Sequence, residues 1–318
     1  MLANNELQAR MLLFPFAASA AIKFVNAGKR FVHYCSADAA TNILSNESVW
    51  MRNARLMNDF SEIEYGTKCL QAALNSSQGS SLKGLLQNSH PVLSPILDDL
   101  GASLPSIRDE TYILCLSEHE RAEDQTGRLS MWRGYGGDLD STAIILNANA
   151  IVAMPDISPV AYLTENEFLQ QFSAVVQSFP RIISLLSNDV TKLREILMTA
   201  FTFAIMCTKH PGFHEEKEWR LVFRPNPASP AIMTKSVVSQ KGFPEVIYQI
   251  PLKNRPDLNI SGIEVRDLVD RVIIGPSDRA DDLRRHFVAL LTKKGVLAPE
   301  QRVIASNIPF RKTITPPQ

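Results

Sequence analysis

The most constraining feature of this sequence is that strand-like and helix-like segments follow one another without regular alternation. The run TYILCLSE at 111–118 is almost wholly apolar, is bounded by charged residues and predicts a buried strand. No predicted strand leads into the glycine-rich loop that a doubly wound nucleotide-binding fold requires. The pattern therefore predicts an α+β fold with a mixed, mainly antiparallel β core and helical insertions.

Other segments repeat these two patterns along the chain. Ser36 or Asp38 is a suitable N-cap for a helix over 37–46. Apolar residues at helical spacing predict further helices over 60–77, within 164–209 and over 278–295. The remaining strands are predicted at 30–36, 48–53, 141–147, 217–224, 245–252, 270–276, 302–306 and 308–313.

The interruptions rich in Pro, Asn and Ser are too dispersed to mark a linker, so we expect one domain over 1–318. Within it we expect an N-terminal helical segment at 1–30, a helical or loop insertion at 77–109 and a helical insertion at 164–209. The apolar stretch at 11–22 favours a core-facing helix over a cleaved signal, because no clearly positive segment precedes it. It is too short to span a bilayer, so no membrane partner is expected.

Charge and cysteine content narrow the functional classes. Lys plus Arg equals Asp plus Glu at 33 each, so no net positive charge favours nucleic acid or anionic membranes. The 4 cysteines are widely separated, with no Cys-x-x-Cys pair, which argues against a structural zinc site and a disulfide framework. This pattern favours a reducing, cytoplasmic setting and predicts no metal ligands among the site residues.

Two early segments carry groups that could bind a ligand. His33 and Tyr34 end a predicted strand just before a helix begins, although such rings also pack and bond locally in many strands. In the following segment MRNARLMND, Arg52 and Asn53 could present hydrogen-bond donors to a phosphate. Solvated loop polarity is the simpler explanation of that second segment.

The segment SMWRGYGG at 130–137 combines aromatic residues with glycines. Trp132 and Tyr135 are three residues apart and share a face if the segment is helical. Glycines beside aromatic rings suit a flat ligand ring stacked next to exposed backbone amides. A tight turn into the next strand explains the same glycines, and the sequence leaves both explanations open.

The segment FHEEKEWRLVF at 213–223 carries carboxylates at the start of a predicted strand. Strand alternation places Glu218 and Arg220 on one face and Trp219 on the other, with Glu216 two residues before Glu218. Neighbouring carboxylates raise one another's pKa, which suits general-base work or hydrogen bonding to sugar hydroxyls. The alternative is a Glu–Arg ladder on an exposed sheet face.

Taken in order, these motifs resemble a bacterial family catalogued as domain of unknown function 2971. The resemblance is carried by FVHYCSADAATNILSNESVWMRNARLMND, MWRGYGG before a strand, EKEWRLV and the late VDRVIIGP. It spans about 31–311, which is nearly the whole chain. The family name implies no activity.

A looser resemblance, to the ADP-ribosyltransferase superfamily, implies a function. An early strand-end His, a downstream aromatic residue and a Glu on a late strand are similar to its NAD site, and Glu-x-Glu to its arginine-directed members. The resemblance implies NAD as the cofactor-like substrate. It implies that His33 holds the ribose and that one of three aromatic residues, Tyr34, Trp132 or Tyr135, stacks on nicotinamide. It also implies that Glu218 stabilises the oxocarbenium-like sugar and that Glu216 orients the acceptor.

We therefore expect NAD-dependent ADP-ribosyl transfer or NAD glycohydrolysis on a nucleotide substrate, in a bacterial toxin or phage-defence effector. Arg52, Asn53 and Arg220 are expected to help bind the nucleotide. One alternative is a non-catalytic nucleotide- or protein-binding module that uses Trp132, Tyr135 and Arg220 as anchors. Another is a metal-dependent nuclease whose carboxylates are Glu215, Glu216, Glu218 and Asp138.

Overall fold

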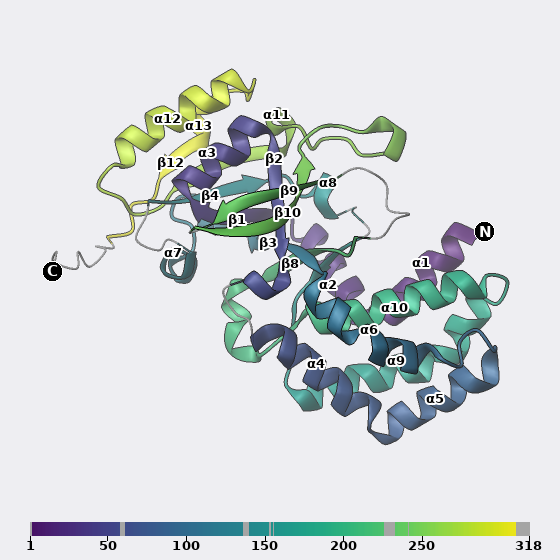
Figure 1. The fold of residues 1–318 in the computed structure, drawn as a ribbon. Helices are drawn as coiled ribbons and strands as arrows, with labels where there is room; N and C mark the ends of the chain where they lie inside the picture. The colour runs from purple at the N-terminus through teal and green to yellow at the C-terminus, as the bar shows by residue number, and fades with distance from the viewer. Residues whose placement is uncertain are drawn as a thin grey trace.

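A ten-stranded sheet with helices on both sides organises the described part of the chain (Figure 1). The computed structural model describes residues 2–57, 61–135, 140–152, 154, 156–225, 233–240 and 242–309. Every strand pair in the large sheet is antiparallel except β11 with β12. The predicted α+β fold with a mainly antiparallel core is confirmed.

The main path of the large sheet runs β12-β11-β4-β1-β3-β2-β10-β9, and β8 joins β3 and β5 away from this path. A separate parallel pair consists of β6 (Ala161–Tyr162) and β7 (Thr208–Lys209). The strands of the large sheet are β1 (Arg30–Ser36), β2 (Ser48–Asn53), β3 (Tyr112–His119), β4 (Ser141–Leu146), β5 (Ile157–Pro159), β8 (Glu218–Phe223), β9 (Thr234–Gln240), β10 (Phe243–Pro251), β11 (Val269–Ile274) and β12 (Val303–Ala305).

One face of the sheet carries a layer of long helices, drawn in the lower half of Figure 1. Their apolar faces form the largest core cluster, and Ile113 of β3 and Val222 of β8 join this cluster from the sheet. These helices are α1 (Leu2–Leu13), α4 (Ser61–Leu74), α5 (Ser77–Ser89), α6 (Ile96–Asp109), α9 (Glu165–Leu185) and α10 (Val190–Met206). The interval 77–109 and most of the interval 164–209 thus belong to the helical layer, and Thr208–Lys209 forms β7.

The other face of the sheet forms a second core, which includes Phe31, Leu116 and Trp219. Helices α2 (Pro15–Asn26), α3 (Ala37–Asn46) and α12 (Ala280–Lys293) contribute apolar residues to it. The remaining helical elements are short. They are η1 (Ala54–Leu56), η2 (Arg121–Glu123), α7 (Leu129–Tyr135), α8 (Asn149–Val152), η3 (Pro211–Glu216), η4 (Pro256–Leu258), α11 (Val265–Leu268) and α13 (Pro299–Arg302).

The apolar stretch at 11–22 spans two helices, because Phe14 leaves the helical conformation and Pro15 begins α2. It faces the core only in part. Leu13 is buried, whereas Met11 is 44% exposed and Ile22 is 53% exposed. No helix in the described part of the chain is long and apolar enough to cross a membrane.

The sheet splits along one edge of β3, and this split positions the site. β8 pairs with β3 from Tyr112 to Ser117 along one edge. On the opposite edge β1 pairs only from Ser117 to His119, and β2 pairs only with Tyr112 and Ile113. Residues 114–116 therefore have no ladder partner on this edge in the described structure.

Candidate functional site

A cavity of about 340 Å³ opens at the split between β1 and β2. Six of the residues expected to form a site line it, and they come from β1, β2, α7, η3 and the start of β8. They are His33, Tyr34, Arg52, Tyr135, Glu216 and Glu218. The strand-end His and the late carboxylates thus share one cavity, although about 185 positions separate them in the sequence.

His33 occupies the position where β1 leaves β3. Antiparallel ladder bonds alternate between the two edges of a strand, and the amide of Glu118 bonds to Lys217 of the chain leading into β8. The carbonyl of Cys115 consequently points to the other edge, into the split, where the Nδ1 of His33 lies 3.1 Å from it.

This contact fixes the protonation of the ring. A carbonyl oxygen only accepts hydrogen bonds, so Nδ1 of His33 carries the hydrogen and donates it. Burial lowers the pKa of His33, although the bond to Cys115 acts in the opposite direction, so the ring is neutral at pH 7. In this tautomer Nε2 is an acceptor, which suits a ligand hydroxyl.

Glu218 is buried in a network of charges. Its two carboxylate oxygens each accept a hydrogen bond of 2.9 Å from the guanidinium of Arg220. The Nζ of Lys209 lies 2.6 Å from Glu216 and 3.8 Å from Glu218. Two carboxylates are therefore balanced by two cations.

The network sets the ionisation of Glu218. Burial acts to raise the pKa of this carboxyl, but Arg220 and Lys209 outweigh it and hold the pKa below its usual value. Glu218 is therefore a fixed anion at neutral pH. The expected Glu–Arg pair does form, but it is buried and does not lie on an exposed sheet face, since Glu218 is 5% and Arg220 3% exposed.

The aromatic residues have unequal access to the cavity. Tyr135 lines it and is 37% exposed. Tyr34 also lines it, but its hydroxyl accepts a hydrogen bond from the amide of Arg128, and burial raises the pKa of Tyr34 to about 12. Trp132 does not line the cavity.

The interpretation of Trp132 as a stacking residue is corrected by its packing. Its indole N–H donates to the carbonyl of Thr126, and its ring meets the Tyr34 ring edge-on at 4.9 Å between centroids. Only 3% of Trp132 is exposed. Trp132 therefore packs against Tyr34 away from the cavity lining, and its ring has no exposed face on which a ligand ring could stack.

The three residues expected to bind phosphate or nucleotide differ in position. Arg52 lines the cavity, but it makes two hydrogen bonds of 2.9 Å to Glu245. Asn53 lies outside the cavity lining, because its side chain caps η1 through Arg55 and donates to the carbonyl of Asp109. Arg220 is committed to Glu218 and does not line the cavity.

Two residues important to the site were not identified from the sequence. Lys209 is 3% exposed and also lies 4.4 Å from the Phe213 ring centroid. Arg128 donates to the carbonyls of Glu215 and Glu216 in η3 and to that of Glu118 in β3. The sequence signal that points to Lys209 is a lysine three residues after the apolar end of α10.

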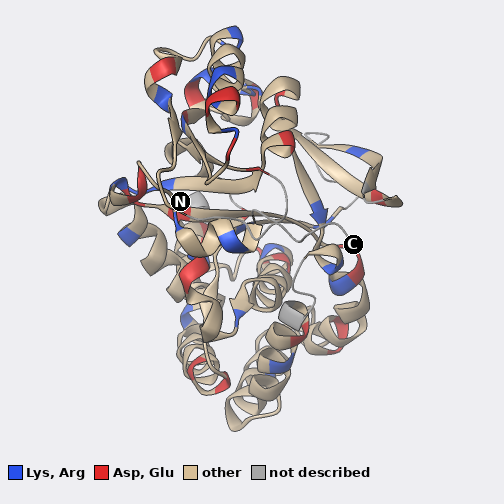
Figure 2. Cartoon of the chain, turned by 90° about the vertical axis from the view of Figure 1, so that its left-hand side faces the viewer, with Lys and Arg blue, Asp and Glu red and all other residues tan. Residues whose placement is uncertain are grey.

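The charge pattern elsewhere is mixed. Acidic and basic residues are interspersed over the sheet region and the helical layer (Figure 2). In the described part of the chain no three His, Cys, Asp or Glu side chains converge to hold a metal ion. Glu215 is exposed and outside the cavity lining, and Asp138, Gly136 and Gly137 lie outside the described residues.

Comparison with known proteins adds one match. No curated protein and no solved structure matches the chain. Residues 131–221 match the model of a family described as protein of unknown function (DUF2971). This region runs from α7 to β8 and contains Glu216 and Glu218. The match supports the resemblance to that family over this part of the chain.

Proposed function

We propose that the cavity binds a nicotinamide nucleotide and that the protein breaks its N-glycosidic bond, by hydrolysis or by transfer of the ADP-ribosyl group. The observation that carries the proposal is that His33, Glu216 and Glu218 line the same cavity. Cleavage of the nicotinamide–ribose bond develops positive charge on the sugar, and a fixed anion stabilises that charge selectively.

The proposed roles follow from the state of each side chain. Neutral His33 presents Nε2 as an acceptor for a ribose hydroxyl. The half-exposed ring of Tyr135 stacks on the nicotinamide. Glu218, held by Arg220, keeps its negative charge without needing to move, so it stabilises the cationic sugar electrostatically.

The proposed reaction releases one proton, and Glu216 is the group that we assign to accept it. The carbon–nitrogen bond breaks with its electron pair passing to the ring nitrogen, so nicotinamide leaves neutral. Water or an acceptor hydroxyl then bonds to the anomeric carbon and releases a proton. Glu216, 21% exposed in its side chain, is the more accessible carboxylate and accepts this proton.

A second candidate function, nucleotide binding without turnover, is favoured by one observation. Both oxygens of Glu218 already accept hydrogen bonds from Arg220, which leaves fewer lone pairs for a sugar hydroxyl. In that case the cavity recognises the nucleotide through His33 and Tyr135, and the buried ion pair only maintains the shape of the wall.

The test is incubation of the full chain with NAD, with nicotinamide release measured by chromatography and NAD binding by calorimetry. We expect turnover that is lost in Glu216→Gln and Glu218→Gln. Glu215→Gln is the matched control, because Glu215 adjoins Glu216 in the chain but lies outside the cavity lining. Tyr135→Ala should raise KM, and Phe243→Ala, which removes a ring that is 75% exposed elsewhere, should not.

The outcomes separate the two functions. NAD binding without nicotinamide release in the wild type supports the binding module and rejects the enzyme. Neither binding nor release rejects both. Because Glu218→Gln also disturbs a buried ion pair, its circular dichroism spectrum and melting temperature must be compared with those of Glu216→Gln.

A further inference from the structure

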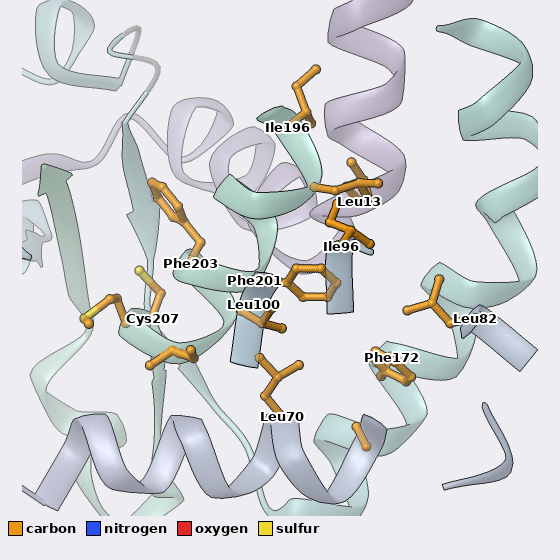
Figure 3. Packing of buried hydrophobic residues seen from close by; sticks show 14 of the residues in the cluster. Leu13, Leu70, Leu82, Ile96, Leu100, Phe172, Ile196, Phe201, Phe203 and Cys207 are labelled. Atoms are coloured by element: carbon orange, nitrogen blue, oxygen red, sulfur yellow. The ribbon is translucent and has the colours of Figure 1, made fainter. Parts of the chain in front are cut away.

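A second cavity, of about 150 Å³, lies inside the helical layer and is distinct from the site at the sheet split. Side chains from α1, α2, α4, α5, α9 and α10 meet around it. Leu82, Phe172 and Phe201 belong to three different helices of this layer (Figure 3). Its wall also includes Leu70, Phe179 and Leu197, each of which is 3% exposed or less.

The wall of this cavity is largely apolar. No charged side chain lines it among the described residues, and the polar ones are Ser158, Gln171 and Thr208. The Ser158 hydroxyl already donates to the carbonyl of Pro159, and Gln171 is exposed. A water molecule needs two to four polar partners, and this largely apolar wall offers few of them.

An empty apolar cavity also costs packing energy, because the atoms of its wall lose contacts on one side. Apolar cavities of about 150 Å³ with walls of this kind take up benzene-sized molecules. The cavity reaches exposed chain at Phe16 and Gln171, which gives a ligand a point of entry. We infer that this cavity binds an uncharged apolar molecule, about the size of a benzene ring or a short alkyl chain.

The parallel pair β6–β7 separates this cavity from the carboxylate site. Ala161 and Thr208 are paired and line the apolar cavity. The next residues, Tyr162 and Lys209, are also paired, and they contact the site: the hydroxyl of Tyr162 accepts from the amide of Glu218, and Lys209 bonds to Glu216. The inference does not depend on glycosidic chemistry.

The experiment titrates toluene into the full chain, with glycerol as a polar compound, and follows the melting temperature and the methyl NMR signals of Leu82 and Leu197. Toluene should raise the melting temperature of the wild type in a saturable manner and shift both methyl signals. Ala204→Leu places a larger side chain on the cavity wall and should abolish both effects. Ala174→Leu, the same change at an exposed position of α9 that is not part of the wall, should preserve them.

Three results overturn the inference. One is a wild type whose methyl signals and melting temperature do not respond to toluene, which makes the cavity a packing defect only. Another is an equal response to glycerol. The last is undiminished toluene binding by a folded Ala204→Leu. If that variant does not fold, the wild-type titration alone decides.

Discussion

The Nδ1 of His33 donates a hydrogen bond to the carbonyl oxygen of Cys115 across 3.1 Å, at the point where β1 separates from β3. The side chain thereby satisfies a backbone group that would otherwise need a ladder partner. The same bond holds the ring in one tautomer with Nε2 as an acceptor. A single contact thus satisfies the Cys115 carbonyl at the split and fixes the tautomer of a ring that lines the cavity.

The protonation of His33 should make stability depend on pH. Its pKa is lowered in the folded protein, so below pH 6.5, its value in the unfolded chain, the unfolded state binds more protons. The free energy of unfolding should therefore decrease as the pH falls below 6.5, by at most about 1.4 kcal/mol per pH unit for one proton. His119, whose pKa burial also lowers, adds to this slope.

His33→Asn keeps a side-chain N–H near Nδ1 but cannot titrate. In urea denaturation at a series of pH values, this variant should lose stability less steeply than the wild type below pH 6.5. The slope that remains comes from His119 and, at lower pH, from carboxyls such as Glu218 whose pKa is also lowered. An identical slope in both proteins would show that the His33 ring is not held neutral in the folded state.

The Glu218–Arg220 pair predicts a non-additive mutant cycle. Arg220→Met removes both guanidinium hydrogen bonds and leaves a buried carboxylate, which should cost about 3–5 kcal/mol in the free energy of unfolding. The double variant Glu218→Met/Arg220→Met buries no such charge and should be more stable than Arg220→Met alone. Equilibrium denaturation tests this, and a double variant as unstable as the sum of the two single ones would contradict it.

The sequence predicted best those features that depend on residues close together in the chain, such as a helix cap or the alternation of side chains along a strand. Ser36 accepts from the amide of Ala39 and so caps α3 as predicted. The alternation in β8 correctly separates Trp219 in one core from Glu218 and Arg220. These features depend on residues a few positions apart, and for that reason patterns reveal them.

Long-range pairing limited the prediction of the site. The burial of Trp132 against Tyr34 depends on α7 packing over β1, which no spacing encodes. Lys209 meets Glu216 only because β7 lies beside β6 and η3 returns toward it. The sequence therefore predicted more of the residues that line the cavity than of the residues that hold those side chains in place.

Arg128 should control the order of the turn that carries the glutamates. Its Nη1 donates to the carbonyls of Glu215 and Glu216, and its Nη2 to Glu118, a planar arrangement that lysine cannot reproduce. Arg128→Lys should accelerate amide hydrogen exchange at 215–218 by mass spectrometry while the helical layer keeps its protection. Arg108→Lys, at an exposed arginine paired with Asp109, serves as the control and should leave that exchange unchanged.

Gly66 should be intolerant of any side chain because α4 lies directly against the end of α10. A Cβ at Gly66 would lie 2.1 Å from the carbonyl oxygen of Ile205, which is backbone and cannot rotate away. Gly66→Ala should therefore destabilise the protein by about 1–3 kcal/mol. Gly84→Ala is the matched control, since a Cβ at that helical position has no neighbour within 4 Å and should stabilise α5 by about 0.5–1 kcal/mol.

The position of Ile205 extends this prediction to the site. The next residue, Met206, accepts a hydrogen bond at its carbonyl from the Nη1 of Arg220, the side chain that holds Glu218. Displacing the last turn of α10 should therefore loosen the carboxylate network, so Gly66→Ala should weaken the proposed nucleotide binding as well as lower the melting temperature. Calorimetry with NAD compares this variant with Gly84→Ala, and a destabilised Gly66→Ala with wild-type affinity would show that the site does not depend on the end of α10.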